Sequence, residues 1–319
     1  MGIEKFFSSL KYNQNKTIIN INENSRFNTE YVYIDFNSIM YKIATEIEDD
    51  LNKLLIDVIY EEHILEEHKH IIKKYELAEN DILNSYNETK IDSYFVSMTI
   101  SDIKRILSEY LESNCIKRIF ISIDGIPNMA KIIEQRRRRY INYIVSELKN
   151  RIYRKYDEKM SDKRKQFEKY RVRFPRGKFG KKEFIDEIIK QLQSDEFIKE
   201  IGCTHPKLVS YVCSDYNDIG EGEKKIMQDI ITCNNSGKYL IYSPDSDLII
   251  LSIIIKNQLD KKNDTTSEFH IMRYDQNNKH YDLININQLE DNIYKYVCDS
   301  INNDVVLPNK NIVLNDIVF

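Results

Sequence analysis

Acidic residues recur in this sequence at the ends of short apolar runs that have strand character. The runs 31–35, 117–124, 208–213 and 238–242 are rich in β-branched and aromatic residues, and acid ends or follows each one. The acids are Asp35, Asp124, Glu221, Glu223, Asp245 and Asp247. In open α/β sheets, ligands bind outside the carboxyl ends of the strands. We therefore expect these side chains to converge in one crevice.

Six carboxylates at one site repel one another and raise each other's pKa, and divalent cations relieve that repulsion. Oxygen-only ligands favour Mg²⁺ or Mn²⁺ over zinc. Two such ions, ~3.5–4 Å apart, can activate a water and stabilise the leaving oxygen of a phosphodiester. Taken singly, each motif has a simpler interpretation, because Asp-x-Asp is often a surface turn and an Asp after a strand is often a helix N-cap. The joint pattern favours a site with two metal ions.

Basic residues gather in one segment of an otherwise acidic chain. The net charge is −4, yet residues 131–182 hold 20 Lys and Arg against 6 Asp and Glu. The local charge is therefore +14, and the other residues carry −18. A solvated helix face is the simpler interpretation of such a run. Its concentration within an acidic chain instead favours binding of a polyanion.

Part of this basic segment has the geometry of a phosphate-binding surface. A helix is predicted from about residue 128 to residue 158. On it, four polar residues fall within an arc of roughly 100° at 100° per residue: Lys131, Gln135, Arg138 and Arg139. Arg forks, a Lys point charge and a Gln amide together suit several phosphate oxygens. We expect this face to read a terminal phosphate close to the carboxylate crevice.

Strands and helices alternate along the chain, which predicts an α/β fold with a mostly parallel twisted sheet flanked by helices. We expect one nuclease domain over residues 1–319. Within it we predict a charged helical insertion at 56–94 and a mobile basic loop at 160–182, the latter because of its Gly and Pro residues.

Composition excludes several classes of protein. The longest clear apolar run, 248–255, is far short of a membrane span, and the N-terminus has no signal-peptide apolar region. Five scattered cysteines without a Cys-x-x-Cys motif argue against a zinc site and favour a reducing compartment. We expect no membrane partner and a location in the cytoplasm or nucleus.

The motifs together resemble the first conserved region of Xrn-type 5′→3′ exoribonucleases, which belong with flap endonucleases in the PIN-like superfamily. The segments that carry the resemblance are Met-Gly-x-x-x-Phe-Phe at the start, Tyr-Ile-Asp35-Phe-Asn, Ile-Asp124-Gly followed by Ala-Lys131-x-x-x-Gln135-x-x-Arg138-Arg139, Gly220-Glu-Gly-Glu-Lys-Lys-Ile-Met227, and Asp245-Ser-Asp247-Leu-Ile.

The resemblance implies a PIN-like core in which the six acids surround Mg²⁺ and the four helix residues bind a 5′-monophosphate. It implies hydrolysis of single-stranded RNA to mononucleotides. Tyr41 stands where the family usually has a His that stacks on the terminal base, and an aromatic side chain can keep that stacking. The chain contains no Trp, whereas the family uses one from its second conserved region.

The family also has a Gly-Asn-Asp-Phe-like motif with a further metal-site aspartate, and this sequence ends at Phe319, short of such a motif. We expect a separate polypeptide to supply that region. Two alternatives stay open beside the exoribonuclease: a flap-type, structure-specific DNA nuclease, and a non-catalytic nucleic-acid-binding remnant. Competition between RNA and DNA separates the first alternative, because proteins distinguish the two by the 2′-OH.

Overall fold

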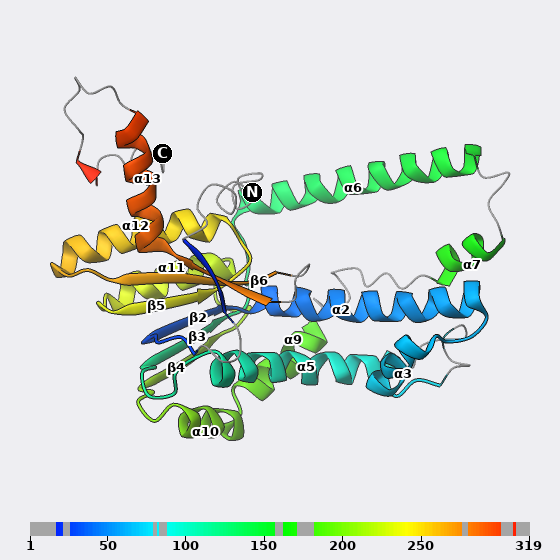
Figure 1. Cartoon of the computed structure of the whole chain (residues 1–319), viewed down its shortest axis with the longest axis horizontal. Coiled ribbons are helices and arrows are strands. Elements are labelled where there is room, and N and C mark those ends of the chain that lie inside the picture. The colour runs from blue at the N-terminus through cyan, green and yellow to red at the C-terminus, as the bar shows by residue number, and fades with distance from the viewer. Residues whose placement is uncertain are drawn as a thin grey trace. The chain divides into compact units, whose positions relative to one another are not determined.

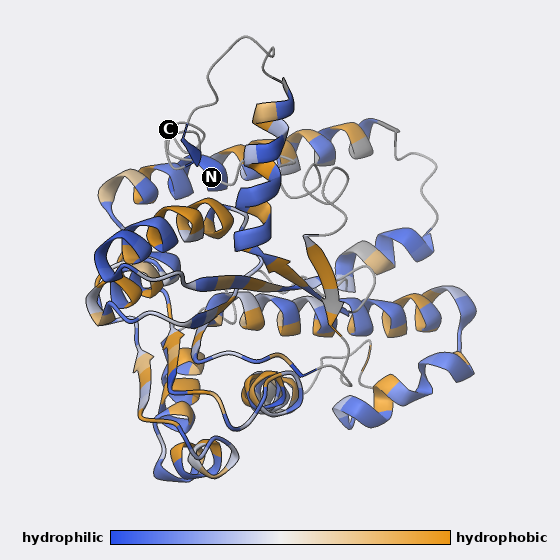
Figure 2. Ribbon diagram, turned by 60° about the vertical axis from the view of Figure 1, so that its left-hand side comes forward, coloured by the Kyte–Doolittle hydropathy of each residue, from blue (hydrophilic) through white to orange (hydrophobic). Residues whose placement is uncertain are grey.

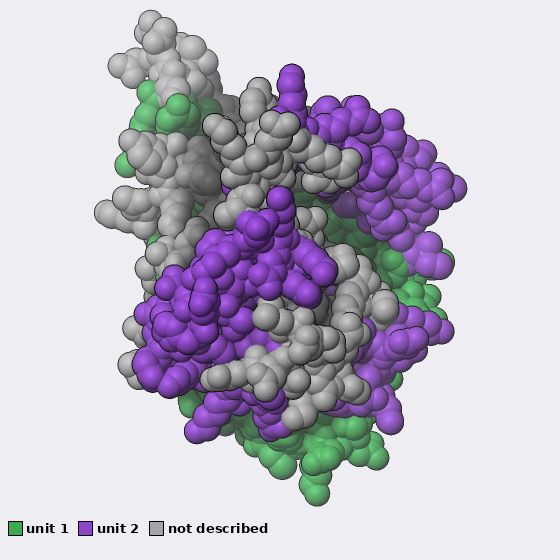
Figure 3. Space-filling model, turned by 90° about the vertical axis from the view of Figure 1, so that its right-hand side faces the viewer, with its two compact units in different colours: residues 1–38, 102–125, 192–319 green, residues 39–101, 126–191 purple. Residues whose placement is uncertain are grey.

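The computed structural model describes residues 17–21, 26–78, 82, 88–156, 162–170, 182–275, 280–300 and 309–310. Contacts divide the chain into two compact units, each built from separate segments (Figure 3). Unit 1 comprises residues 1–38, 102–125 and 192–319, and unit 2 comprises residues 39–101 and 126–191. The segments of the two units interleave along the chain. The expected single nuclease domain over residues 1–319 stays a prediction.

Unit 1 contains a seven-stranded sheet, which confirms the predicted α/β class with a mostly parallel sheet (Figure 1). The spatial order is β1-β7-β6-β5-β2-β3-β4. The strands are β1 (Ile18–Ile21), β2 (Tyr31–Asp35), β3 (Arg118–Ser122), β4 (Ser210–Ser214), β5 (Lys238–Tyr242), β6 (Glu268–Asp275) and β7 (His280–Asn285). Strands β4, β3, β2, β5 and β6 run parallel, whereas β7 is antiparallel to both β6 and β1.

The described part of unit 1 contains four further helices, of which the first precedes β4 and the other three follow β4, β5 and β7. They are α10 (Asp195–Thr204), α11 (Gly222–Cys233), α12 (Asp247–Asn263) and α13 (Ile286–Ser300). Helix α11 packs on β2 and β3, while α12 and α13 pack on β6 and on each other. Ser194 caps α10, because its side chain accepts a hydrogen bond from the backbone N–H of Phe197.

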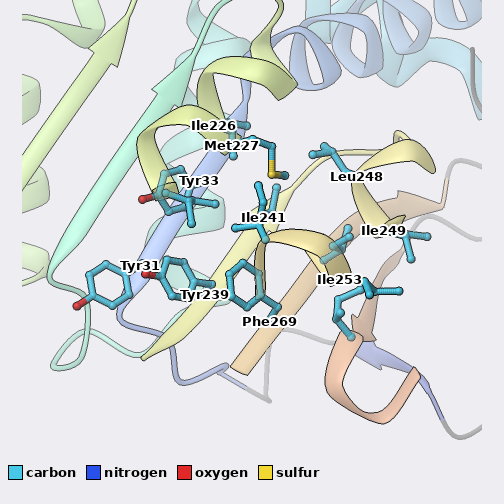
Figure 4. Packing of buried hydrophobic residues seen from close by; sticks show 14 of the residues in the cluster. Tyr31, Tyr33, Ile226, Met227, Tyr239, Ile241, Leu248, Ile249, Ile253 and Phe269 are labelled. Atoms are coloured by element: carbon cyan, nitrogen blue, oxygen red, sulfur yellow. The ribbon is translucent and has the colours of Figure 1, made fainter. Parts of the chain in front are cut away.

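The hydrophobic core of unit 1 lies between the sheet and these helices (Figure 4). Aromatic rings on neighbouring strands form a row across it. Tyr31 stacks on Tyr239 with 4.7 Å between ring centroids, and Tyr239 stacks on Phe269 at 4.5 Å. The register places these residues directly opposite one another. Their burial fixes the alignment of β2, β5 and β6, and so fixes which residues end those strands together.

All the regular secondary structure in the described part of unit 2 is helical. It contains most of α2 (Phe36–Ile56) and α5 (Glu88–Glu109), with η1 (Asp57–Glu61), η2 (Glu66–His68) and α3 (Lys69–Tyr75) between them. It also contains α6 (Met129–Tyr156), α7 (Asp162–Tyr170) and nearly all of α9 (Lys182–Leu192). In the segment 56–94 the described residues are helical except at 62–65 and 76–78, and its role as an insertion stays a prediction.

One expectation about unit 2 needs correction. The segment 160–182 was expected to be a loop, but residues 162–170 form helix α7. Within α7, Lys163 donates to the backbone carbonyl of Tyr60 and pairs with Glu62, both at 3.0 Å. The Gly and Pro residues that suggested a loop lie at 171–181, outside the described residues. None of the helices in the described part of the chain is long and apolar enough to cross a membrane.

Candidate metal centre

The register of the three central strands brings the predicted acids of unit 1 to one edge of the sheet. Asp35 ends β2 opposite Ser122 of β3, two residues before Asp124. On the other side, Ile34 lies opposite Tyr242 of β5, three residues before Asp245. Between β2 and β5 the chain order reverses direction across the sheet, which is the position where ligands bind in open α/β folds.

The pKa of Asp35 shows that several carboxylates lie close together at this edge. Burial, followed by the negative charge of Asp124, raises the pKa of Asp35 to about 7. Glu223 and Asp245 raise it further, while a hydrogen bond from Ser243 opposes the shift. The Ser243 hydroxyl donates to Asp35 Oδ2 at 2.9 Å. Three of the other predicted acids therefore raise the pKa of Asp35, which is the repulsion that a bound divalent cation would relieve.

Gly222 lies between two of these carboxylates. A Cβ atom at this position would be 3.2 Å from Asp124 Oδ1 and 3.3 Å from Asp35 Oδ1. The Gly222 N–H donates to Asp124 Oδ1 at 2.6 Å, and its carbonyl accepts from the Ser122 hydroxyl at 3.0 Å. Gly220, just before it, has φ = 117°, a backbone conformation that other residues rarely adopt. The φ of Gly220 favours glycine, and a side chain at position 222 would crowd the carboxylates of Asp124 and Asp35.

The same turn opens α11 and carries Glu221 and Glu223. Glu221 is the N-cap residue of the helix and is buried, whereas Glu223 in the first turn is half-buried. Lys225, one turn further on, is buried and donates to the carbonyls of Ile123 at 2.8 Å and Asp215 at 2.5 Å. Burial lowers its pKa, against the charges of nearby acids that include Asp124. Lys225 thus ties the segment before Asp124 to α11.

Asp245 and Asp247 lie between β5 and α12. The Ser243 hydroxyl accepts a hydrogen bond from the Asp245 N–H at 3.2 Å, and Asp245 Oδ1 accepts one from the Asp247 N–H at 3.1 Å. Asp245 is exposed, and Asp247 is half-buried in the first turn of α12. Ser243 therefore positions both Asp35 and the Asp245 loop. Sequence reasoning missed this role of Ser243, although the motif contained the residue.

Among the described residues, the one group of three possible metal ligands whose atoms meet was not predicted, and it includes none of the six acids. Ligand atoms of Asp275, His280 and Asp282 lie within 4.8 Å of one another, and His280 Nε2 is 3.0 Å from Asp282 Oδ1. The group belongs to the β6–β7 pair, where Asp275 lies opposite His280. Burial lowers the pKa of Arg273, while Asp282, Asp245 and Asp275 act in the opposite direction. The alternation of His280 and Asp282 along β7 was the available sequence signal.

The residues predicted to bind phosphate lie in unit 2, on α6. The structure confirms a helix here, beginning at Met129, and Asn128 caps it by accepting from the Lys131 N–H at 2.9 Å. Lys131 and Gln135 are half-buried, whereas Arg138 and Arg139 are exposed. Sequence reasoning did not anticipate that Arg138 pairs with Glu134 at 2.5 Å. The binding role of these four residues stays a prediction.

Tyr41, the predicted base-stacking residue, lies on α2 with 38% of its surface exposed. Its backbone carbonyl accepts a hydrogen bond from the Thr45 hydroxyl within the helix. No ligand contact tests the stacking role, which stays a prediction.

The raised pKa of Asp35 predicts how stability depends on pH in metal-free protein. Between about pH 4 and pH 7 the folded protein holds a proton that the unfolded chain has released, so the free energy of unfolding falls as pH rises. Asp35→Asn removes that proton equilibrium. We expect it to stabilise the protein at pH 8 by on the order of a few kcal/mol, and much less at pH 4.

Urea unfolding in EDTA at both pH values measures this effect. Asp49→Asn, which changes an exposed acid on α2, is the control and is expected to leave stability unchanged. An Asp35→Asn protein less stable than wild type at pH 8 would contradict the electrostatic strain inferred for this site.

Comparison with known sequences identifies the family to which the chain belongs. The profile of the family described as "XRN 5′-3′ exonuclease N-terminus" matches residues 70–275, which is more than half of the chain. The chain belongs to this family. The matched range contains Asp124, helix α6, the Gly220–Glu223 turn, Asp245 and Asp247, whereas Asp35 lies before it.

A curated relative of this XRN-family chain comes from Acanthamoeba polyphaga mimivirus and is named "Putative 5'-3' exonuclease". It is 28% identical over 142 residues, a region that covers 42% of this chain and 21% of the relative. The matched region therefore spans about a fifth of that relative's length.

Proposed function

We propose that this chain carries the catalytic core of a 5′→3′ exoribonuclease that hydrolyses single-stranded RNA with a 5′-monophosphate to mononucleotides. The observation that carries the proposal is the buried carboxyl of Asp35 at the edge of the sheet, whose pKa is raised by burial and by Asp124, Glu223 and Asp245. Membership of the XRN family supports it. A structural ion-pair network would pair acids with bases, whereas the strongest shift here arises from burial and from other acids.

The donor set fits hard divalent cations. Every predicted ligand is a carboxylate, and carboxylate oxygens suit Mg²⁺ or Mn²⁺. Asp35, Asp124, Glu221, Glu223, Asp245 and Asp247 would hold the ions. Two such ions supply an activated water and charge stabilisation at the scissile phosphate. The Ser243 hydroxyl holds Asp35 and the Gly222 N–H holds Asp124, while the Ser122 hydroxyl holds the Gly222 carbonyl.

Recognition of the substrate end is assigned to α6. Lys131, Gln135, Arg138 and Arg139 share one face of this helix, and they would bind the 5′-phosphate. Arg138 is held by Glu134 at 2.5 Å, so phosphate binding would require this pair to open or to share the guanidinium. Tyr41 would stack on the terminal base.

Direction, metal and sugar preference test the proposal together. RNA with a 5′-monophosphate and a 3′ label should lose nucleotides from its 5′ end when Mg²⁺ or Mn²⁺ is present, and should stay intact in EDTA. A DNA strand of the same sequence should be degraded more slowly and should compete poorly, since it lacks the 2′-OH. Internal cleavage of branched DNA would favour a flap-type nuclease, and binding without hydrolysis would favour a non-catalytic role.

A further inference from the structure

Helix α6 carries an apolar surface that the proposed nuclease function does not use. Between Arg136 and Ser146, more than three turns, every residue is exposed. Large apolar side chains nonetheless recur along the helix, visible as orange segments interspersed with blue in the ribbon of α6 (Figure 2). We call the following six residues the apolar stripe, each with 38–66% of its surface exposed: Ile133, Tyr140, Ile141, Ile144, Leu148 and Ile152.

The apolar stripe is one continuous face of the helix. At 100° per residue its six members fall within an arc of about 120°. The predicted phosphate-binding residues fall within a separate arc of about 100°, centred roughly 150° away. The helix therefore has two opposed faces of different chemistry. A role in phosphate recognition explains the basic face and leaves the apolar stripe without a function.

Leaving an apolar stripe of this length exposed to water is unfavourable in free energy. The helix has 28 residues, a length of about 42 Å. Most helical stability in proteins comes from packing an amphipathic face, and large exposed apolar patches mark interaction surfaces. Apolar residues at Ile141, Ile144, Leu148 and Ile152 have spacings of three and four, which is the pattern by which one helix packs on another.

Charge selects the chemistry of the partner. Arg137, Arg151 and Lys155 fall within the arc of the stripe and are exposed, whereas the one described acid within it, Glu134 at its edge, pairs with Arg138. A second copy of α6 packed antiparallel about Ile144 would bring Arg137 opposite Arg151, and a parallel copy would bring each arginine opposite itself. Both arrangements place like charges in the seam, which is unfavourable. An amphipathic helix with acidic residues beside its apolar positions would cover the apolar stripe and would also pair with its arginines.

We propose that the apolar stripe of α6 is a docking site for an acidic amphipathic helix. Such helix-to-helix docking uses apolar anchors at spacings of three and four, with charges at the edges that choose the partner. The site is independent of the nuclease proposal, because it uses the face of α6 opposite to the predicted phosphate-binding residues.

The test uses the 319-residue protein and designed peptides as probes. The acidic peptide is a 28-residue helix with Leu and Ile in its apolar seam and Glu at the flanking positions. A basic peptide has Lys in place of Glu, and a third peptide has the acidic composition in scrambled order. Fluorescence anisotropy should show the acidic peptide binding at least tenfold more tightly than either of the others. Raised salt should weaken this binding, since the charges are exposed.

Three variants locate the site. Ile141→Gln with Ile144→Gln should weaken acidic-peptide binding at least tenfold, because two apolar side chains that the peptide would bury are lost. Asn142→Gln, exposed on the opposite face, is the matched control and should bind as wild type does. Arg137→Glu with Arg151→Glu should reverse the preference toward the basic peptide. Gln and Glu are good helix formers, so circular dichroism should show α6 intact in all three.

Several results would overturn the proposal. Equal binding of the acidic, basic and scrambled peptides would mean non-specific adhesion. Concentration-dependent dimerisation that Ile141→Gln with Ile144→Gln abolishes would mean that a second copy covers the stripe. Loss of RNA binding in those variants, with peptide binding unchanged, would assign the stripe to the RNA path. None of these results bears on whether the carboxylate edge hydrolyses RNA, so the two proposals can fail separately.

Discussion

Replacing Asp245 and Asp247 together by alanine is expected to lower RNA hydrolysis by ~10³-fold or more while leaving RNA binding intact. These acids lie on the loop after β5, and Asp245 contributes to the raised pKa of Asp35. Loss of metal-held charge stabilisation removes several kcal/mol at the transition state. Binding should persist, because carboxylates without metal repel the RNA backbone. Single-turnover hydrolysis and filter binding on the same RNA measure the two effects.

Asp299→Ala, an exposed acid on α13, is the control for this double variant and should hydrolyse RNA at the wild-type rate. The assignment fails if the double variant loses RNA binding and cooperative unfolding together, because the two acids would then be structural. Asp245 is exposed and its main-chain N–H is held by Ser243, so we expect the fold to survive.

The second large effect concerns the end of the substrate. Arg138→Ala should lower turnover of 5′-monophosphate RNA by roughly ten- to a hundredfold, since a charge-assisted bond to phosphate is worth about 1.5–3 kcal/mol. It should change turnover of 5′-hydroxyl RNA far less, because the phosphate partner is already missing there. Wild-type protein should prefer the monophosphate over both the 5′-hydroxyl and the bulkier 5′-triphosphate. Competition between end-labelled RNAs provides the measurement.

Arg136 provides the matched control, because it lies on the same helix but outside the arc of the predicted phosphate-binding residues. Arg136→Ala should affect all three RNAs mildly and equally. Similar behaviour of Arg136→Ala and Arg138→Ala on every RNA would mean that α6 is a general electrostatic surface. Glu134→Gln provides a further test of this contact. Because it removes the charged partner of Arg138, it should strengthen monophosphate binding if the arginine reaches the phosphate.

Short-range sequence patterns were enough to predict the carboxylate edge. A strand that ends in acid is visible within a few residues, and parallel strands must end at the same edge of the sheet. The structure places Asp124, Glu223 and Asp245 near enough to Asp35 to raise its pKa, while the role of the six acids as metal ligands stays a prediction. The helix at 128–158 was also predictable, because its pattern is local and long.

Features that depend on distant partners were not predictable. Strand β7 pairs with β1, about 260 residues away in the sequence, and no local pattern predicted either strand. Lys225 was part of a recognised motif, but its bonds to the carbonyls of Ile123 and Asp215 exist only in the folded chain. Helix α7 was missed because the Gly and Pro residues beyond it dominated the interpretation of its neighbourhood.

Gly222 has a consequence for how related sequences are compared. A single methyl group at this position would lie 3.2–3.3 Å from two carboxylate oxygens that are expected to share a metal ion. A descendant could therefore lose its nuclease activity through one alanine here while keeping every acidic residue and the whole sheet. Searches that count acids would still score such a protein as an enzyme. Inspection of this one glycine would be needed to distinguish a working nuclease from a silent copy.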